Sequence, residues 1–228
     1  MKKCDPTGAR TQDPYIKSVL LYQLSYRVII FSNKAANIDR NFNLIVAVLL
    51  FSAIFSGMSK PIFIIGYMGS GKTRLAKVLG KYLNTDYFDL DDCISSSLGK
   101  NIDEIFEKDG ELIFRKAEKE QLRLFKGKSG IISVGGGTPC YYENMKWMNL
   151  HGTTVYLKAK IPTLVSRILN DKNIYRPLLK GVDRTNIYEF VAKHLFERRA
   201  FYEQCDIICD TEKTGWEKEL IESLQSLD

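Results

Sequence analysis

A glycine-rich loop is the clearest chemical feature of this 228-residue sequence. The segment Gly66-Tyr-Met-Gly-Ser-Gly-Lys72-Thr73 matches the pattern G-x-x-x-x-G-K-[ST], between an apolar run and a helical pattern. Backbone N–H groups of such a loop face phosphates, and the helix N-terminus adds its dipole. The lysine neutralises the β- and γ-phosphates, and the threonine hydroxyl coordinates Mg²⁺. The loop predicts nucleotide binding by Gly69, Ser70, Gly71, Lys72, Thr73 and Arg74.

A D-x-D pair, Asp89 and Asp91, lies at the end of the second expected strand, which follows this loop and its helix. Read as a strand, this segment places both carboxylates on one face, at the sheet edge where α/β proteins bind ligands. Solvated or helix-capping aspartates remain the alternative interpretation. The pair therefore indicates either ligand chemistry or a helix start.

Two arginines and a triple glycine are the remaining candidates for substrate binding. Arg115 and Arg198 lie in charged helical segments, where a surface ion pair is the ordinary role. A guanidinium fork, however, binds a carboxylate through two parallel hydrogen bonds, which lysine cannot do. Gly135, Gly136 and Gly137 directly follow an apolar strand pattern, and glycine permits either close approach of a ligand or a turn with positive φ.

A polar segment, residues 170–181, has the composition of a mobile lid that excludes water from a phosphoryl-transfer site. It contains Arg176 in the run Arg-Pro-Leu-Leu, and an arginine there could stabilise charge on the transferring phosphoryl group. Arg167, just before this segment, could stack on adenine. We therefore predict Arg167 and Arg176 as further contacts to ATP.

The order of these motifs over residues 58–228 resembles that of the shikimate kinase family, small-metabolite kinases related to nucleoside monophosphate kinases. The resemblance implies an enzyme that transfers the γ-phosphoryl group of ATP to the 3-hydroxyl of shikimate in aromatic amino-acid biosynthesis. It implies that Asp91 is the base, that Lys72 and Arg176 are catalytic, and that Thr73 and Asp89 hold Mg²⁺. Shikimate would contact Asp91, Arg115, Arg198 and the triple glycine. Arg74 departs from the family, which commonly has Ser or Thr there.

Two other functions remain open at this point. A different small-metabolite kinase, such as a gluconate kinase, would also use arginines to bind a carboxylate. A nucleotide-binding module without phosphotransfer should lack Asp91 or the lid arginine, and both are present. The D-x-D, triple glycine and Arg-Pro-Leu-Leu together favour shikimate.

The elements that must position these residues alternate between short apolar runs and helical patterns. This alternation predicts a three-layer α/β/α domain with a central five-stranded parallel sheet of the P-loop kinase type. We expect strands at 62–66, 86–90, 131–134, 154–157 and 207–209. The expected helices are 72–83, one or two within 102–125, 161–169, 184–202 and 216–224.

Residues 1–57 differ from the rest of the sequence. They carry seven of the Lys and Arg residues and three of the Asp and Glu residues, so the remainder is close to neutral despite a net charge of +6. The apolar run 44–56 is too short for a relaxed membrane-spanning helix and lies too far from the N-terminus for an ordinary secretory signal. The stretch TGARTQDPYIKSVLLYQLSYR resembles peptides produced when a transfer-RNA gene is translated by mistake. We therefore expect residues 1–57 to be a spurious or disordered leader and 58–228 to be the single domain.

The composition excludes several classes of protein. A near-neutral domain does not predict nucleic-acid binding, and we expect no membrane partner. Cys205 and Cys209 lack nearby histidine, so core packing is favoured over a metal site. We expect a cytoplasmic monomer whose partners are ATP and shikimate.

Overall fold

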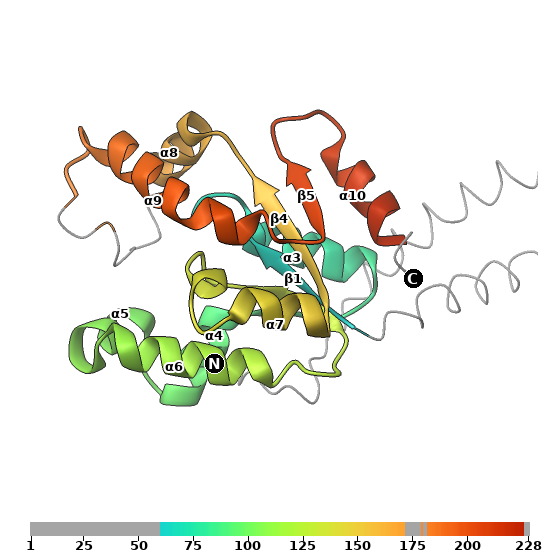
Figure 1. Ribbon diagram of the computed structural model, residues 1–228, viewed down its shortest axis with the longest axis horizontal. Helices are drawn as coiled ribbons and strands as arrows, with labels where there is room; N and C mark the ends of the chain where they lie inside the picture. Colours follow the sequence, from blue (N-terminus) through green and yellow to red (C-terminus); the bar gives the residue numbers. More distant parts are fainter. Residues whose placement is uncertain (1–59, 172–178, 180–181, 226–228) are drawn as a thin grey trace, which may run out of the picture. The chain divides into compact units, whose positions relative to one another are not determined.

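A five-stranded parallel sheet forms the centre of the computed structural model, which describes residues 60–171, 179 and 182–225 (Figure 1). The strand order is β2-β3-β1-β4-β5, and every pairing is parallel. Because all five strands run the same way, their carboxyl ends share one edge of the sheet. The strands are β1 Pro61–Ile65, β2 Tyr87–Asp89, β3 Gly130–Ser133, β4 Thr153–Lys158 and β5 Ile207–Asp210.

Helices cover both faces of this sheet, so the three-layer α/β/α prediction is confirmed. Helix α3 contacts β1, β2 and β3, α10 contacts β5, and α7 contacts β4. The α-helices are α3 Lys72–Tyr82, α4 Leu90–Leu98, α5 Ile102–Glu104, α6 Glu111–Arg123, α7 Asn144–His151, α8 Ile161–Asn170, α9 Ile187–Tyr202 and α10 Trp216–Gln225. A π-helix, Ile105–Asp109, joins α5 to α6, and a 3₁₀ turn, Thr138–Cys140, precedes α7.

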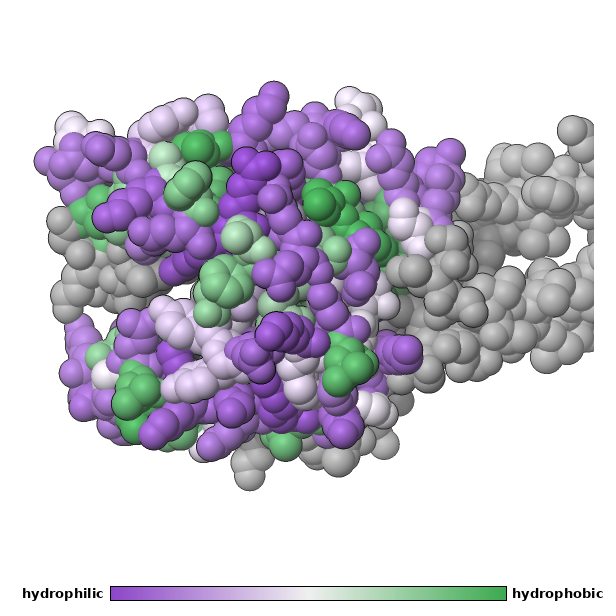
Figure 2. Space-filling view, in the orientation of Figure 1, coloured by the Kyte–Doolittle hydropathy of each residue, from purple (hydrophilic) through white to green (hydrophobic). Residues whose placement is uncertain are grey.

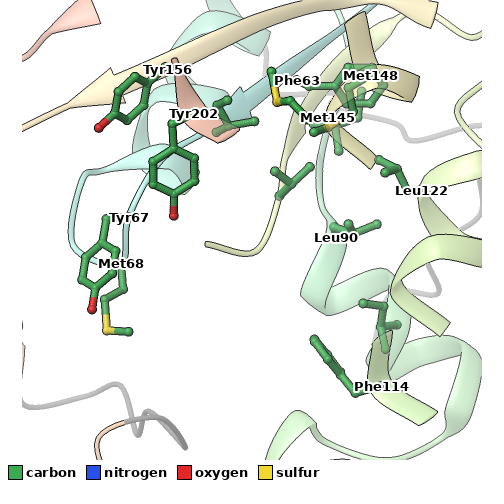
Figure 3. Close-up of a cluster of buried hydrophobic side chains, with 14 of the residues drawn as sticks. Phe63, Tyr67, Met68, Leu90, Phe114, Leu122, Met145, Met148, Tyr156 and Tyr202 are labelled. Atoms are coloured by element: carbon green, nitrogen blue, oxygen red, sulfur yellow. The ribbon is translucent and has the colours of Figure 1, made fainter. Parts of the chain in front are cut away.

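Alternation along β1 divides its side chains between the two faces. Phe63 and Ile65 belong to a buried cluster with residues of α4, α6, α7 and α9, whereas Ile62 and Ile64 point to the opposite face. Figure 3 shows Phe63 beside Met145 and Met148 of α7, and Tyr202 of α9 beside Tyr156 of β4. Strands β1 and β3 are buried along their whole length because both faces of the sheet are covered there, whereas the edge strands β2 and β5 are only partly buried.

The described elements match most of the expected ones. Helix α9 begins at Ile187 rather than at residue 184, and neither α4 nor α7 was expected. The leader 1–57 and most of the expected lid, 170–181, lie outside the described residues. Within the described part of the chain, no helix is long and apolar enough to cross a membrane.

The surface seen in Figure 2 is mainly hydrophilic, with hydrophobic residues scattered among polar ones. A hollow separates the part formed by α8 and α9 from the part formed by α5 and α6 (Figure 2). No group of three His, Cys, Asp or Glu side chains in the described ranges could hold a metal ion. Cys205 and Cys209 are free thiols, and Cys209 is buried in the core.

Candidate active site

The glycine-rich loop connects β1 to α3 at the carboxyl edge of the sheet. Gly66, Gly69 and Gly71 all have positive φ, of 144°, 78° and 97°, which side chains other than glycine rarely adopt. Gly71 is the N-cap of α3, so the first N–H groups of that helix face into the loop. Lys72 Nζ donates to the Tyr67 carbonyl across the loop, 3.1 Å away. The loop therefore has the backbone shape and the cation of an anion site.

Three oxygen-bearing side chains meet beside this loop. Thr73 Oγ1 donates to Asp89 Oδ2 at 2.8 Å and lies 3.3 Å from Ser133 Oγ. Asp89 and Ser133 are register partners at the ends of β2 and β3, which explains why they meet. Oxygen ligands of this kind suit Mg²⁺, which takes one or two protein ligands and completes its shell with water and phosphate. The donor set fits the expected ion at Thr73 and Asp89, and it adds Ser133.

The two aspartates of the D-x-D pair do not share a strand face, so that part of the sequence interpretation was wrong. Asp89 ends β2 and caps α4, while Asp91 lies in the first turn of that helix. The Asp89 carboxylate accepts the Asp91 N–H through Oδ1, at 3.1 Å, and the Thr73 hydroxyl through Oδ2. Aspartate is a preferred N-cap because its carboxylate accepts an unpaired N–H of the first turn. Asp89 therefore caps the helix and still reaches the phosphate loop.

Asp91 is held in an environment that opposes its ionisation. Its Oδ1 atom is shielded from solvent and accepts no hydrogen bond from the described residues. Burial, together with the nearby carboxylates of Asp89 and Glu118, raises the pKa of Asp91 from 3.8 to about 7, against the opposing charge of Lys72. A carboxyl group with a pKa near the operating pH can both take and release a proton.

Arg115 is a buried arginine on α6 whose charge is balanced on its own helix. Its Nη1 donates to Glu118 at 2.9 Å and its Nε to Glu111 at 3.1 Å. Glu118 is fully buried, and Thr138 donates a second hydrogen bond to it at 2.5 Å. Burial raises the pKa of Glu118, while Arg115 and the Thr138 hydroxyl oppose that rise. Glu118 therefore links Arg115 to Thr138, in the turn that follows the triple glycine.

The triple glycine lies against the side chains of Asp91, Arg115 and Glu118. A methyl group placed on Gly137 would lie 2.7 Å from Arg115 Nη2, and one on Gly135 would lie 3.3 Å from Asp91 Oδ1. Neither residue has a positive φ, so space rather than backbone conformation requires glycine here. The turn with positive φ is therefore excluded for Gly135 and Gly137, and the close approach of a ligand stays a prediction.

Arg198 on α9 reaches the same loop from the other side. Its Nη1 would lie 3.7 Å from a methyl group on Gly136, and its guanidinium carbon is 5.7 Å from the centre of the Tyr67 ring. Tyr202, one turn later, is buried and donates its hydroxyl proton to the Gly136 carbonyl. By contrast, Arg199 is exposed and paired with Glu203 on its own helix, as expected of a surface residue.

Of the residues expected to contact ATP, some lie at the glycine-rich loop and others do not. Arg167 Nη1 lies 3.3 Å from the carbonyl oxygen of Gly69, so this arginine covers the phosphate loop. Ser70 is buried in the loop, and its Oγ has no hydrogen-bond partner among the described residues. Arg74 is exposed on α3. Arg176 lies outside the described residues.

Sequence reasoning missed Glu118 and Ser133. Glu118 lies three residues after Arg115, a spacing that places both on one side of a helix. Ser133 lies at the end of a strand, two residues before the triple glycine. Each had a local signal, but a lone Glu in a charged helix or a Ser at a strand end is too common to single out.

Comparisons with known proteins agree with this geometry. The family model described as shikimate kinase matches residues 68–227. The shikimate kinase of Flavobacterium psychrophilum is 45% identical over 152 residues, which cover 64% of this chain and 86% of that protein. The shikimate kinase of Bacillus cytotoxicus is 43% identical over 152 residues, covering 67% of this chain and 88% of its own length.

Solved structures give the same result. The crystal structure of a shikimate kinase from Bacteroides thetaiotaomicron is 35% identical, with a TM-score of 0.65, covering 74% of this chain and 97% of that one. The shikimate kinase from Acinetobacter baumannii, solved in complex with shikimate, is 28% identical, with a TM-score of 0.67, covering 77% and 96%. With a family model that spans most of its length and relatives of this similarity, the chain belongs to the shikimate kinase family.

Proposed function

We propose that this protein transfers the γ-phosphoryl group of ATP to the 3-hydroxyl of shikimate, giving shikimate 3-phosphate for aromatic amino-acid biosynthesis. The observation that carries the proposal is the position of Arg115 beside the triple glycine. Its Nη1 and Nη2 atoms border Gly137, where a side chain would collide with them. A buried guanidinium that faces bare backbone is well suited to a small planar carboxylate.

Asp91 is the proposed base. Its raised pKa suits a group that accepts the proton of a substrate hydroxyl, and so does its Oδ1 atom, which lies beside Gly135 and has no hydrogen-bond partner in the part of the chain that the structure describes. As that proton moves to Asp91, the hydroxyl oxygen bonds to the γ-phosphorus and the bond from phosphorus to the β-phosphate oxygen breaks, releasing ADP. Asp91 also orients the hydroxyl, and orientation with charge neutralisation supplies most of the rate in phosphoryl transfer.

The phosphate loop and its neighbours hold the ATP triphosphate. Gly69, Ser70 and Gly71 offer backbone N–H groups, and Lys72 neutralises charge on the β- and γ-phosphates. Mg²⁺, when bound to Thr73 with Asp89 and Ser133 nearby, would offset charge on the phosphate oxygens. Arg167 is positioned to contact the nucleotide, and Arg74 is a weaker candidate because it points to solvent.

Four expectations that accompany this function remain proposals. Arg176 stabilises the transferring phosphoryl group from the lid, and residues 1–57 are dispensable for catalysis. The protein works as a monomer, and it acts in the cytoplasm. If residues 1–57 are dispensable, a chain that begins at Met58 should retain full activity.

The proposed function is tested by coupled ADP release from the full chain with Mg-ATP, in parallel wells that contain shikimate, gluconate or no acceptor. Turnover that depends on shikimate is expected. Turnover with gluconate alone would keep the kinase reaction and overturn the assigned substrate. ATP binding without turnover on either acceptor would favour a nucleotide-binding module.

A further inference from the structure

Tyr141 covers the guanidinium of Arg115, in a position that the proposed mechanism does not use. The guanidinium carbon lies 4.2 Å from the centre of the Tyr141 ring, within the range of a cation–π interaction. The Tyr141 hydroxyl donates to Glu111 Oε1 at 3.1 Å. That same oxygen accepts the hydrogen bond from Arg115 Nε, also at 3.1 Å. Each of Tyr141, Arg115 and Glu111 therefore contacts the other two.

The backbone fixes Tyr141 firmly in this position. The Asn144 N–H donates to the Tyr141 carbonyl at 2.9 Å, and the buried Asn144 side chain donates to the Thr138 carbonyl at 3.0 Å. Tyr142 and Glu143, the next two residues, have positive φ of 49° and 54°. Each costs about 1 kcal/mol or more in a residue other than glycine. The turn tolerates this strain where it delivers the Tyr141 ring to α6.

The contacts of Arg115 leave part of its fork available. A guanidinium has five N–H donors, and the described partners of Arg115 take Nε and one donor of Nη1. The remaining donors, on Nη1 and Nη2, border Gly137. With one flat face under Tyr141, the guanidinium can turn away only by breaking its contacts to Glu111 and Glu118. Burial raises the pKa of the Tyr141 hydroxyl, so it remains a donor at neutral pH.

We propose that Tyr141 is a positioning residue, which holds the Arg115 fork toward Gly137 so that it meets the carboxylate of the acceptor already oriented. This inference rests on the proposed function. An arginine side chain loses about 2 kcal/mol of rotamer freedom when it is fixed, and a residue that fixes it before binding spares the substrate that cost. Tyr141 thus acts on acceptor affinity and not on the phosphoryl transfer step.

The neighbouring tyrosine provides a matched control. Lys119, one turn further along α6 than Arg115, makes a contact of the same kind. Its Nζ lies 5.3 Å from the centre of the Tyr142 ring. Tyr142 is exposed, as are Tyr141 and Lys119, and of the two cations only Arg115 is among the described atoms nearest to the triple glycine. A general loss of packing between this turn and α6 would affect both tyrosines, whereas a role in orienting the guanidinium belongs to Tyr141 alone.

The test compares Tyr141→Ala, Tyr141→Phe and Tyr142→Ala in the full chain, by steady-state kinetics. Tyr141→Ala should raise KM for shikimate about tenfold, with kcat and KM for ATP within about twofold of the unsubstituted protein. Tyr141→Phe keeps the ring and loses the hydrogen bond to Glu111, so its KM should rise only about threefold. Tyr142→Ala should behave like the unsubstituted protein. A thermal melt checks that each variant is folded.

A second readout separates positioning from packing. The methyl ester of shikimate lacks the carboxylate charge, so its inhibition constant should be the same for Tyr141→Ala and the unsubstituted protein. Three results would overturn this inference while leaving the proposed function intact. They are an unchanged KM for shikimate in Tyr141→Ala, an equal loss of affinity for the acid and the ester, and an equal rise in KM in Tyr142→Ala. If the unsubstituted chain does not phosphorylate shikimate, the proposed function and this inference both fall.

Discussion

Replacing Asp91 by asparagine should remove activity and, at neutral pH and above, make the protein more stable. Asparagine has the shape of aspartate but cannot take a proton from the acceptor hydroxyl. Loss of a general base typically costs on the order of a hundredfold to ten-thousandfold in rate. The gain in stability follows from the environment of the carboxylate, since its buried Oδ1 has no hydrogen-bond partner among the described residues and it lies near Asp89 and Glu118.

The size of this gain follows from the pKa shift of Asp91. The pKa rises from 3.8 to about 7 on folding, so the folded state binds the proton more tightly. The stability that this proton provides is fully present below about pH 4 and is lost as pH rises to about 7. A shift of about three units corresponds to roughly 4 kcal/mol. The buried amide of asparagine also lacks partners and costs about 1–2 kcal/mol, which leaves a net gain of about 2 kcal/mol at pH 8.

Urea unfolding of the full chain, without nucleotide and with EDTA, measures this effect. The difference in unfolding free energy between Asp91→Asn and the unsubstituted protein should increase in favour of the variant from pH 5 to pH 8. Asp92→Asn is the control, because Asp92 is exposed in the same helical turn and should show a much smaller change with activity retained. A difference that does not vary between pH 5 and pH 8 would refute the reasoning about the buried carboxylate.

Three further predictions concern the neighbouring groups. Arg115→Lys keeps the charge but loses the fork, so KM for shikimate should rise about a hundredfold while KM for ATP stays unchanged; equal effects on both substrates would contradict this. Gly137→Ala places a methyl group 2.7 Å from Arg115 Nη2, so KM for shikimate should rise about tenfold in the same coupled assay, and a normal KM would mean that the loop yields easily. Thr73→Val removes the hydroxyl beside Asp89, so the Mg²⁺ concentration for half-maximal activity should rise about tenfold; an unchanged Mg²⁺ titration would exclude Thr73 as a ligand.

The fold was predictable because its signals are local. Strands β1 and β3 are short runs that are buried along their whole length, and the loop at Gly66 stands between β1 and an amphipathic helix. The boundary between β2 and α4 was not predictable in the same way. The sequence after Phe88 continues with alternating apolar and acidic residues, which is typical of a strand, but the Asp89 carboxylate captures the Asp91 N–H and starts a helix. Capping by one side chain outweighed the strand pattern.

Glu118 shows why part of the site could not be predicted. In the sequence it is one acidic residue in a helix rich in charge, and such residues are mostly solvated. Only the packing of α6 against the turn at Thr138 removes it from water and gives it Arg115 and Thr138 as partners. The importance of this residue therefore comes from tertiary contacts, and its spacing from Arg115 is too common a pattern in a charged helix to reveal them. Helix α7 was missed for a related reason, since its eight residues show too few turns for a period to be seen.

The segment from Ser133 to Tyr141 connects the nucleotide site and the acceptor site that we propose. Ser133 ends β3 beside Thr73 on the nucleotide side, and Gly135 begins the acceptor side two residues later, against Asp91 and Glu118. Gly136 and Gly137 then face one arginine each, and Tyr141 returns to α6. A strand of the central sheet anchors one end of this segment, and the buried Asn144 side chain holds the other end through the Thr138 carbonyl. Phosphoryl transfer depends on in-line placement of donor and acceptor, so a short rigid connection through bare backbone provides that placement more directly than two independent loops could.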